Sequence, residues 1–241
     1  FNEAFQTHNV WLQFGNFFQQ SRIYVPWQRH LIGSGDGTVL VKQFHGDQIL
    51  PGPQSVLRDF FFDGLPEWSG GAIIVEEAGY NWQLIQNVNG AGKEYCLKLR
   101  DQGAGGRLTV DNCSWVTRDA AFSVQLPIAS EEPGNGIRTF NNIVFNGTWG
   151  FDLGGAADTY IRRCNFTNFK FRDNSLGGDI ESCRFATGGP IELRGANFAI
   201  FNNRCQHPFH MMPSFNNSDV WQYRGAGVVN MGVGANVRVH V

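Results

Sequence analysis

The chain has 241 residues, enough for one large domain with its own core. Charged residues make up only 17%, and 30 glycines accompany 21 phenylalanines. The formal net charge of −2 excludes the basic surface expected of a nucleic-acid-binding protein, and no apolar run is long enough to span a membrane. Such a chain is poor in helix formers and rich in strand and turn formers, so we predict an all-β protein.

The N-terminal part, residues 1–45, is predicted to hold a short capping helix and the first coils of a β-structure. Phe1, Ala4 and Phe5 fall on one face of a helical turn. Strand-like segments follow at 10–14, 21–26 and 30–41.

Alternate glycines interrupt the third of these segments, at Gly33, Gly35 and Gly37. A phosphate-binding loop would need a Lys-Ser/Thr pair and a helix after its glycines. Here the Thr-Val-Leu-Val segment at 38–41 follows, which is typical of a strand. We therefore predict that the glycines form a corner of the first coil.

From residue 46 to residue 241 a six-residue pattern recurs. In each copy the first and sixth positions are apolar, and the second and third are polar or variable. The fourth position is small or apolar, and the fifth is polar. Its first position is occupied by Leu57, Ile85, Val110, Phe140, Ile161, Ile180, Ile200 and Val220. The copies are about twenty residues apart in the C-terminal half and about 25 to 30 apart upstream, where loops are expected.

A second pattern runs in phase with the first, with apolar residues every 20 positions. They are Phe151, Phe171, Ile191, Met211 and Met231. No unit of this size can bury its own apolar face, but stacked units bury a continuous column. The two patterns predict a parallel β-helix of about nine coils, with 46–241 as one continuous body.

The repeat also accounts for the five cysteines, an odd number at wide spacings that fits neither a disulfide framework nor a zinc site. Cys113, Cys164 and Cys183 share the fourth position of the pattern with Phe60, Val88 and Ile143. Cys205 shares the sixth position with Trp115, Phe145, Phe166 and Phe185. We predict inward, inert thiols. The six histidines form no metal-ligand pattern, so we expect neither a metal nor a cofactor.

The residue after each inward position of the second pattern is predicted to face outward. In chain order this outward column contains Lys98, Ser123, Asp152, Arg172 and Glu192. Coils are about 4.8 Å apart, so the carboxyls of Asp152 and Glu192 could approach the roughly 6.5–9.5 Å separation of an inverting glycosidase. In that hypothesis one carboxyl protonates the leaving oxygen, the other activates water, and Arg172 and Lys98 bind the sugar.

Two other interpretations of this column stay open. An acid, a base and an acid on neighbouring strands also form an ordinary ion-pair ladder. An arginine between two carboxyls lowers their pKa, whereas a general acid needs a raised pKa. A sugar-binding strip that cleaves nothing is the third interpretation.

Other candidate binding residues lie in loops and on aromatic positions. Glu131 and Glu132 belong to the long insertion 127–136 and could wall a groove, although a solvated loop is the default interpretation. Trp149 could stack on sugar rings or contribute to a subunit interface, as could Trp68, Trp82 and Trp221.

The order of the first segments carries a family resemblance. A capping helix, a strand, a glycine turn and the segment Ile32-Gly33-x-Gly35-x-x-Thr38-x-Leu40 resemble the start of the pectate-lyase-like, single-stranded right-handed β-helix proteins. Within that superfamily the chain looks most like a bacteriophage tailspike or tail-fibre β-helix. The resemblance implies a homotrimer within a larger virion or fibre assembly, located in the virion tail or outside the cell.

The resemblance also implies binding of bacterial surface polysaccharide, with or without its cleavage as a depolymerase. The Arg-x-Pro-x-x-Arg segment of pectate lyases is absent, as are the Asn-Thr-Asp, Asp-Asp and Gly-His-Gly motifs of polygalacturonases. No catalytic residue is therefore transferred. A secreted polysaccharide lyase or hydrolase, and a non-catalytic spike or fibre module, remain as alternatives. The chain starts at Phe1 rather than Met, which favours a segment of a longer polypeptide.

Overall fold

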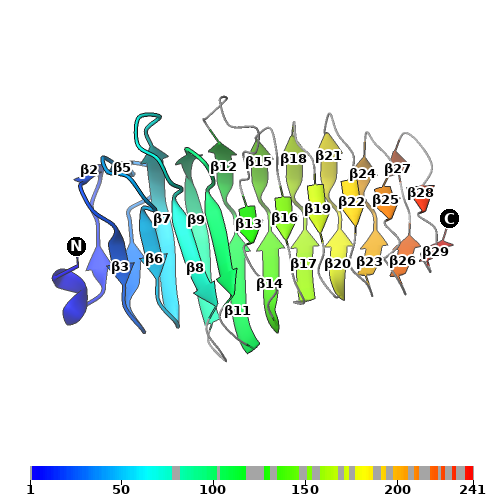
Figure 1. The fold of residues 1–241 in the computed structure, drawn as a ribbon, viewed down its shortest axis with the longest axis horizontal. Coiled ribbons are helices and arrows are strands. Elements are labelled where there is room, and N and C mark those ends of the chain that lie inside the picture. The colour runs from blue at the N-terminus through cyan, green and yellow to red at the C-terminus, as the bar shows by residue number, and fades with distance from the viewer. Residues whose placement is uncertain are drawn as a thin grey trace.

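The structure is a computed structural model of the chain. It describes residues 2–77, 82–101, 104–117, 128–130, 135–146, 151–153, 158–167, 171–173, 177–186, 191–193, 198–205, 209–211, 218–221, 224–225, 230–231 and 237–240. All pairings between the described strands are parallel, and the strands form a 19-stranded and a 10-stranded sheet. The fold is a parallel β-helix, as predicted, whose coils stack along the long axis of the molecule (Figure 1).

The larger sheet contains two stacks of strands that meet at a corner. The first stack comprises β1 (Val10–Trp11), β4 (His30–Ile32), β7 (Ser55–Gly64), β9 (Trp82–Gly92), β11 (Ala104–Asp111), β14 (Asn135–Asn141), β17 (Asp158–Arg162), β20 (Gly177–Glu181), β23 (Phe198–Phe201), β26 (Ser218–Trp221) and β29 (Val237–His240). The second stack comprises β2 (Gly15–Gln19), β5 (Thr38–Lys42), the C-terminal parts of β7 and β9, β12 (Ser114–Thr117), β15 (Val144–Asn146), β18 (Asn165–Thr167), β21 (Arg184–Ala186), β24 (Arg204–Cys205) and β27 (Arg224–Gly225).

The smaller sheet is the third stack. It comprises β3 (Ile23–Val25), β6 (Ile49–Pro51), β8 (Ile73–Glu77), β10 (Leu97–Asp101), β13 (Ile128–Ser130), β16 (Phe151–Leu153), β19 (Phe171–Asp173), β22 (Ile191–Leu193), β25 (Phe209–Met211) and β28 (Asn230–Met231). Ten strands of this stack lie within the described residues, so the number of coils differs from the predicted nine.

The first position of the repeat forms one row of paired residues along the first stack, as predicted. In order the row is Val10, Leu31, Leu57, Ile85, Val110, Phe140, Ile161, Ile180, Ile200, Val220 and Val239. Its members from Leu31 to Ile180 are fully buried in the core. Identical positions of successive coils therefore stack on one another, which buries a column that no single coil could cover.

A single residue in left-handed conformation makes the corner between the first and second stacks. In chain order these corner residues are Asp59, Asn87, Asn112, Asn142, Arg163, Ser182 and Asn202. Asparagine and aspartate tolerate this conformation better than most residues. Their side chains also bond along the stack, with Asn87 Nδ2 donating to Asp59 Oδ1 at 2.8 Å and Asn112 Nδ2 to Asn87 Oδ1 at 2.7 Å.

The residue after each corner points into the core, which confirms the prediction for three cysteines. Phe60, Val88, Cys113, Ile143, Cys164 and Cys183 occupy this position and are at most 3% exposed. Burial raises the pKa of Cys113 to about 12 and that of Cys183 well above its usual value. Each thiol donates to backbone carbonyls, such as that of Glu181 from Cys183 at 3.2 Å. These cysteines are packing residues rather than nucleophiles.

The sixth position of the repeat also forms the predicted row, now inside the second stack. Trp115 pairs with Phe145, followed by Phe166, Phe185 and Cys205. The rings of Phe166 and Phe185 are stacked with their centroids 4.7 Å apart. Trp115 is buried, and its indole Nε1 donates to the carbonyl of Val88 at 2.8 Å.

The second pattern is correct for its first three residues and wrong for the last two. Phe151, Phe171 and Ile191 pair in register in the third stack. Ile191 then pairs with Phe209, so Met211 and Met231 lie in the row of Leu193 instead. The coil after Ile191 is two residues shorter than the coil before it. A register shift by an even number of residues leaves the alternation of inward and outward positions unchanged.

At the N-terminus the predicted helix is a three-residue 3-10 helix, η1 (Ala4–Gln6). Phe5 is fully buried in the core, whereas Ala4 is exposed, contrary to the prediction, and Phe1 lies outside the described residues. Asn2 donates to the carbonyl of Arg22 at 3.1 Å and accepts from the amide of Tyr24 at 2.9 Å. The segment thus covers one end of the core and caps the edge of β3 (Figure 1).

The alternate glycines form a corner of an early coil, as predicted. Gly35 has a φ of +96°, and β5 begins shortly afterwards at Thr38. Gly33 passes so close to the next coil that a Cβ atom there would lie 2.1 Å from the carbonyl oxygen of Asp59. The glycines therefore serve chain packing in this region.

Candidate functional site

The backbone register places the two predicted acidic residues in one row, two coils apart. Asp152 pairs with Arg172, and Arg172 pairs with Glu192, in the third stack. Two strand spacings therefore separate Asp152 from Glu192, about 10 Å between backbones. Lys98 lies in the same row but pairs with Ala129, which takes the place that we predicted for Ser123. Ser123 itself lies outside the described residues.

The other predicted site residues are only partly placed. Glu131, Glu132 and Trp149 lie outside the described residues. Lys98 is half-buried, with its Nζ 5.4 Å from the centroid of the Tyr95 ring. Trp68 is half-buried and contacts the His45 ring edge-on. The binding and catalytic roles of these residues stay predictions.

An open depression of about 630 Å³ lies on the outer face of the second stack. It was not foreseen from the sequence. Its lining contains Asp36, Val39, Phe61, Asn89, Gly90, Ala91, Ser114 and Val116. Val39 pairs with Phe61, and Phe61 with Asn89, so the depression extends over several neighbouring coils.

Hydrogen bonds fix the polar side of this depression. Asn89 Nδ2 donates to Asp36 Oδ1 at 2.7 Å, although the two residues are 53 positions apart in the chain. Asn89 Oδ1 in turn accepts from the amide of Ser114 at 2.8 Å. The Asp36 side chain is exposed and that of Phe61 is half-buried. An aromatic surface thus lies beside a carboxylate and an amide whose orientation is set before any ligand arrives.

The row that contains Phe61 and Asn89 continues along the second stack past the depression. Its next members are Ser114, Val144, Asn165, Arg184, Arg204 and Arg224. Val144 is 43% exposed. Arg184 and Arg204 are exposed, and Arg184 lies between the buried Cys183 and Phe185. We call Arg184, Arg204 and Arg224 the arginine ladder. Three arginines therefore follow one another on successive coils.

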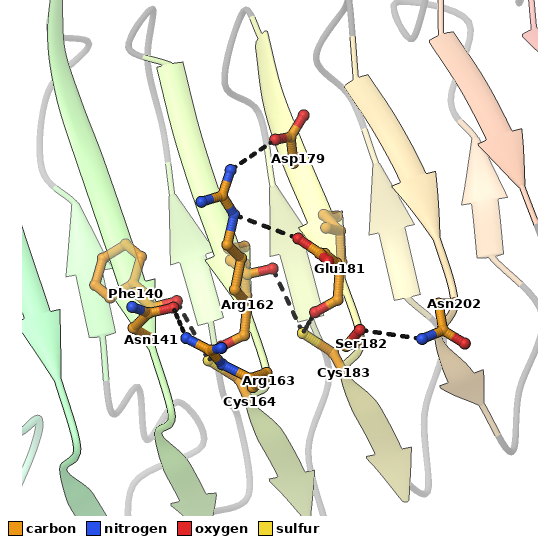
Figure 2. A network of polar contacts seen from close by, with 12 residues as sticks. Phe140, Asn141, Arg162, Arg163, Cys164, Asp179, Glu181, Ser182, Cys183 and Asn202 are labelled. Carbon is orange, nitrogen blue, oxygen red and sulfur yellow. Dashed lines mark hydrogen bonds and ion pairs between the residues drawn. The ribbon is translucent and has the colours of Figure 1, made fainter.

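On the neighbouring first stack an arginine has acidic partners. Arg162 Nη2 lies 3.0 Å from Asp179 Oδ2, and its Nε lies 3.5 Å from Glu181 Oε2 on the next coil (Figure 2). Arg162 also lies over the Tyr160 ring, 5.4 Å from its centroid. These half-exposed pairs form a cross-strand ion-pair network, an arrangement that stabilises the sheet modestly.

A buried polar cluster lies at the corner that leads to the third stack. Lys42 Nζ donates to the carbonyl of Ser69 at 2.6 Å, and burial lowers the pKa of Lys42 to about 8. Asp47 accepts from Arg22 at 3.1 Å, from the amide of Gly71 at 3.1 Å and from the hydroxyl of Tyr95. Lys42 is only 1% exposed, so this cluster joins loops and offers no reactive amine to a ligand.

Within the described part of the chain, no group of three or more His, Cys, Asp or Glu side chains could hold a metal ion. No helix there is long and apolar enough to cross a membrane.

Sequence reasoning missed both features of the second stack, for different reasons. The arginine ladder occupies the fifth position of the six-residue pattern, so its spacing was visible in the sequence. The sequence contains no comparable spacing for the depression. Asp36 and Asn89 come together only because the turn that contains Asp36 reaches over the coil between them. Comparison with protein-family models, with curated proteins and with solved structures finds no match for this chain.

Proposed function

We propose that this chain is a tailspike-like receptor-binding protein of the pectate-lyase-like right-handed β-helix class, which binds bacterial surface polysaccharide. The observation that carries the proposal is the depression on the outer face of the second stack. Ligand sites are concave and largely apolar, with a few well-placed polar groups, and this depression has that composition.

The residues of the depression suit a sugar better than an apolar ligand. The half-buried Phe61 offers an aromatic surface on which the C–H face of a sugar ring can lie. Asp36 is exposed beside it and accepts one hydrogen bond from Asn89, so it can accept further bonds from sugar hydroxyls.

The scaffold supports binding of a long polymer. Each coil contributes one outward residue to the row that contains Phe61 and Asn89, and parallel pairing keeps these residues in register. A rigid row at a regular spacing can contact successive units of a chain molecule without prior rearrangement. As part of the same proposal we expect a homotrimer within a larger virion or fibre assembly, in the virion tail or outside the cell.

The test is binding to a panel of bacterial capsule and O-antigen polysaccharides. We expect at least one polysaccharide to bind, and Phe61→Ala to weaken that binding by about tenfold or more. Phe18→Ala is the matched control, because Phe18 is 60% exposed on the same stack but does not line the depression. Binding of no polysaccharide, or equal losses in both variants, would contradict the proposal.

Cleavage is tested on the same panel by following the chain length of each bound polymer. If the Asp152–Glu192 hypothesis holds, the polymer shortens, and Asp152→Asn and Glu192→Gln each abolish shortening while binding persists. Shortening that survives both replacements would assign catalysis elsewhere. A bound polymer of constant length would leave a receptor-binding module without depolymerase activity.

A further inference from the structure

Arg184 and Arg204 of the arginine ladder form a cluster of positive charge that has no ion-pair partner among the described residues, on a chain whose formal net charge is −2. Arg184 pairs directly with Arg204, and Arg204 with Arg224. Like charges opposite one another on neighbouring strands, about 4.8 Å apart, destabilise a sheet. A folded protein that holds this arrangement does so at a cost in stability.

The described residues supply no counter-charge for Arg184 or Arg204. Arg184 and Arg204 have no ion-pair partner among them, whereas Arg162 on the neighbouring stack binds two carboxylates. The side chains of Arg184 and Arg204 are exposed, so their guanidinium groups are accessible from outside.

A hydrogen-bond acceptor lies in the same row, one coil before the ladder. Asn165 pairs with Arg184, and its Oδ1 is buried without a hydrogen-bond partner. A buried acceptor of this kind costs free energy until a donor reaches it. This oxygen has no exposed surface, so a ligand cannot reach it, and we assign binding to the exposed guanidinium groups that follow it in the row.

We propose that the arginine ladder binds the acidic groups of a linear acidic polysaccharide that lies along the helix axis. This inference rests on the proposed function and specifies its ligand class. Arginine binds carboxylates and phosphates through two parallel hydrogen bonds, and here the forks repeat at the coil spacing. Acidic groups on successive units of the polymer would neutralise the ladder one coil at a time.

The experiment compares wild type, Arg184→Gln/Arg204→Gln and Arg107→Gln on the same polysaccharide panel. Arg107 is an exposed arginine of β11 on the first stack and controls for the loss of charge alone. Each acidic polymer is paired with its carboxyl-reduced form, which has the same backbone without the charge. Single-stranded DNA is included as a polyanion without the hydroxyls of a glycan.

We expect acidic polymers to bind and the double variant to bind them about ten- to hundredfold more weakly, because each lost bond involves a charged group. Arg107→Gln should bind as wild type does. Binding should also weaken as salt rises, since exposed charges are screened. Loss of binding on carboxyl reduction would identify carboxylates as the acidic groups, and binding confined to phosphate-bearing polymers would identify phosphates.

Failure of this inference is distinguishable from failure of the proposed function. If only neutral polysaccharides bind, or if acidic ones bind the double variant normally, the ladder is not the site while the polysaccharide-binding function stands. If DNA binds in preference to every glycan and the double variant loses it, the ladder is a nucleic-acid site and the inference is wrong. If nothing on the panel binds, the proposed function fails and the inference fails with it.

Folding of the double variant is checked by circular dichroism and by its unfolding midpoint, which should equal or exceed that of wild type because like charges are removed. Arg184→Lys/Arg204→Lys provides a second variant that retains the charge but loses the two-pronged geometry. Its affinity should lie between those of wild type and the glutamine variant. Equal affinity of the lysine variant and wild type would overturn the two-pronged contact.

Discussion

Buried thiols show how single residues serve this fold. Cys96 is fully buried, and its Sγ donates to the carbonyl of Val116 at 3.3 Å. Burial disfavours the thiolate and raises the pKa of Cys96 from 9.0 to about 12. The folded protein therefore retains this proton over a pH range in which the unfolded chain releases it.

This difference predicts that Cys96 makes stability fall at alkaline pH. Between pH 9 and pH 12 the unfolded state binds fewer protons at this residue than the folded state, so the free energy of unfolding decreases as pH rises. Cys96→Ala lacks the titrating group. From pH 8 to pH 10, wild type should therefore lose about 1.4 kcal/mol of stability relative to the variant.

Urea unfolding of both proteins at pH 7, 8 and 10 measures this change. The stability difference between them should be the same at pH 7 and pH 8, where the thiol is protonated in both states, which provides an internal control. A difference that stays constant up to pH 10 would contradict the burial argument.

At the scale of single residues, the burial of apolar side chains in the repeat was predictable from the sequence, whereas the burial of polar side chains was not. The inward positions of Cys113, Cys164 and Cys183 follow from period and alternation, and the structure confirms them. Asn203 occupies the same inward position, 2% exposed, where it accepts from the amide of Cys183 and donates to the carbonyl of Ile180, both at 2.8 Å. Arg138 is fully buried as well. Polarity alone assigns such residues to the surface, because only the folded core supplies their partners.

The corner between the first and second stacks is the element that most shapes each coil. One left-handed residue turns the chain, and the alternation of buried and outward residues starts again after it. In β7, Leu57 before the corner residue Asp59 and Phe60 after it both point inward. Arg163 has a φ of +53° at this corner, and its long side chain makes a single 3.4 Å bond to Asn141.

We predict that Arg163→Asn stabilises the protein by about 1 kcal/mol, because a left-handed conformation costs an ordinary residue roughly that amount and costs asparagine less. Urea or thermal unfolding measures the change. Arg107→Asn is the control, since Arg107 is an exposed arginine of β11 outside the corner, and it should show no gain. Equal or lower stability of Arg163→Asn would contradict the corner argument.

Among the elements, repeated strands were predicted better than irregular ones. The stacked rows that contain Ile161 and Phe166 agree with the pattern, because equivalent positions of successive coils must fit the same packing environment. The row of Met211 was misplaced, because a coil two residues shorter leaves the alternation of faces unchanged and so leaves no trace in the pattern. The N-terminal helix is shorter than expected because only Phe5 has a core surface to cover.

At the scale of the whole molecule, each coil pairs with the coils before and after it, from β1 with β4 to β26 with β29. The fold was therefore predictable from a local repeat. The candidate site was predictable only where it follows that repeat, as the arginine ladder does. The depression was not, because its Asp36–Asn89 bond passes over the coil between them, and no periodicity encodes such a contact.

Stacking of this kind predicts that a destabilising substitution at one end of the β-helix affects the coils near that end and leaves distant coils unaffected. Phe5 is fully buried and covers the N-terminal end of the core, so Phe5→Ala should lower the free energy of unfolding of the adjacent coils by about 3–5 kcal/mol. Since stability in stacked coils is transmitted between neighbours, amide exchange should accelerate in β1, β2 and β3 while protection in β17 and β20 persists. Trp11→Ala is the matched control, because Trp11 is 67% exposed on the same coil, and its profile should resemble that of wild type. A uniform loss of protection along the chain in Phe5→Ala would show that the β-helix unfolds as one cooperative unit.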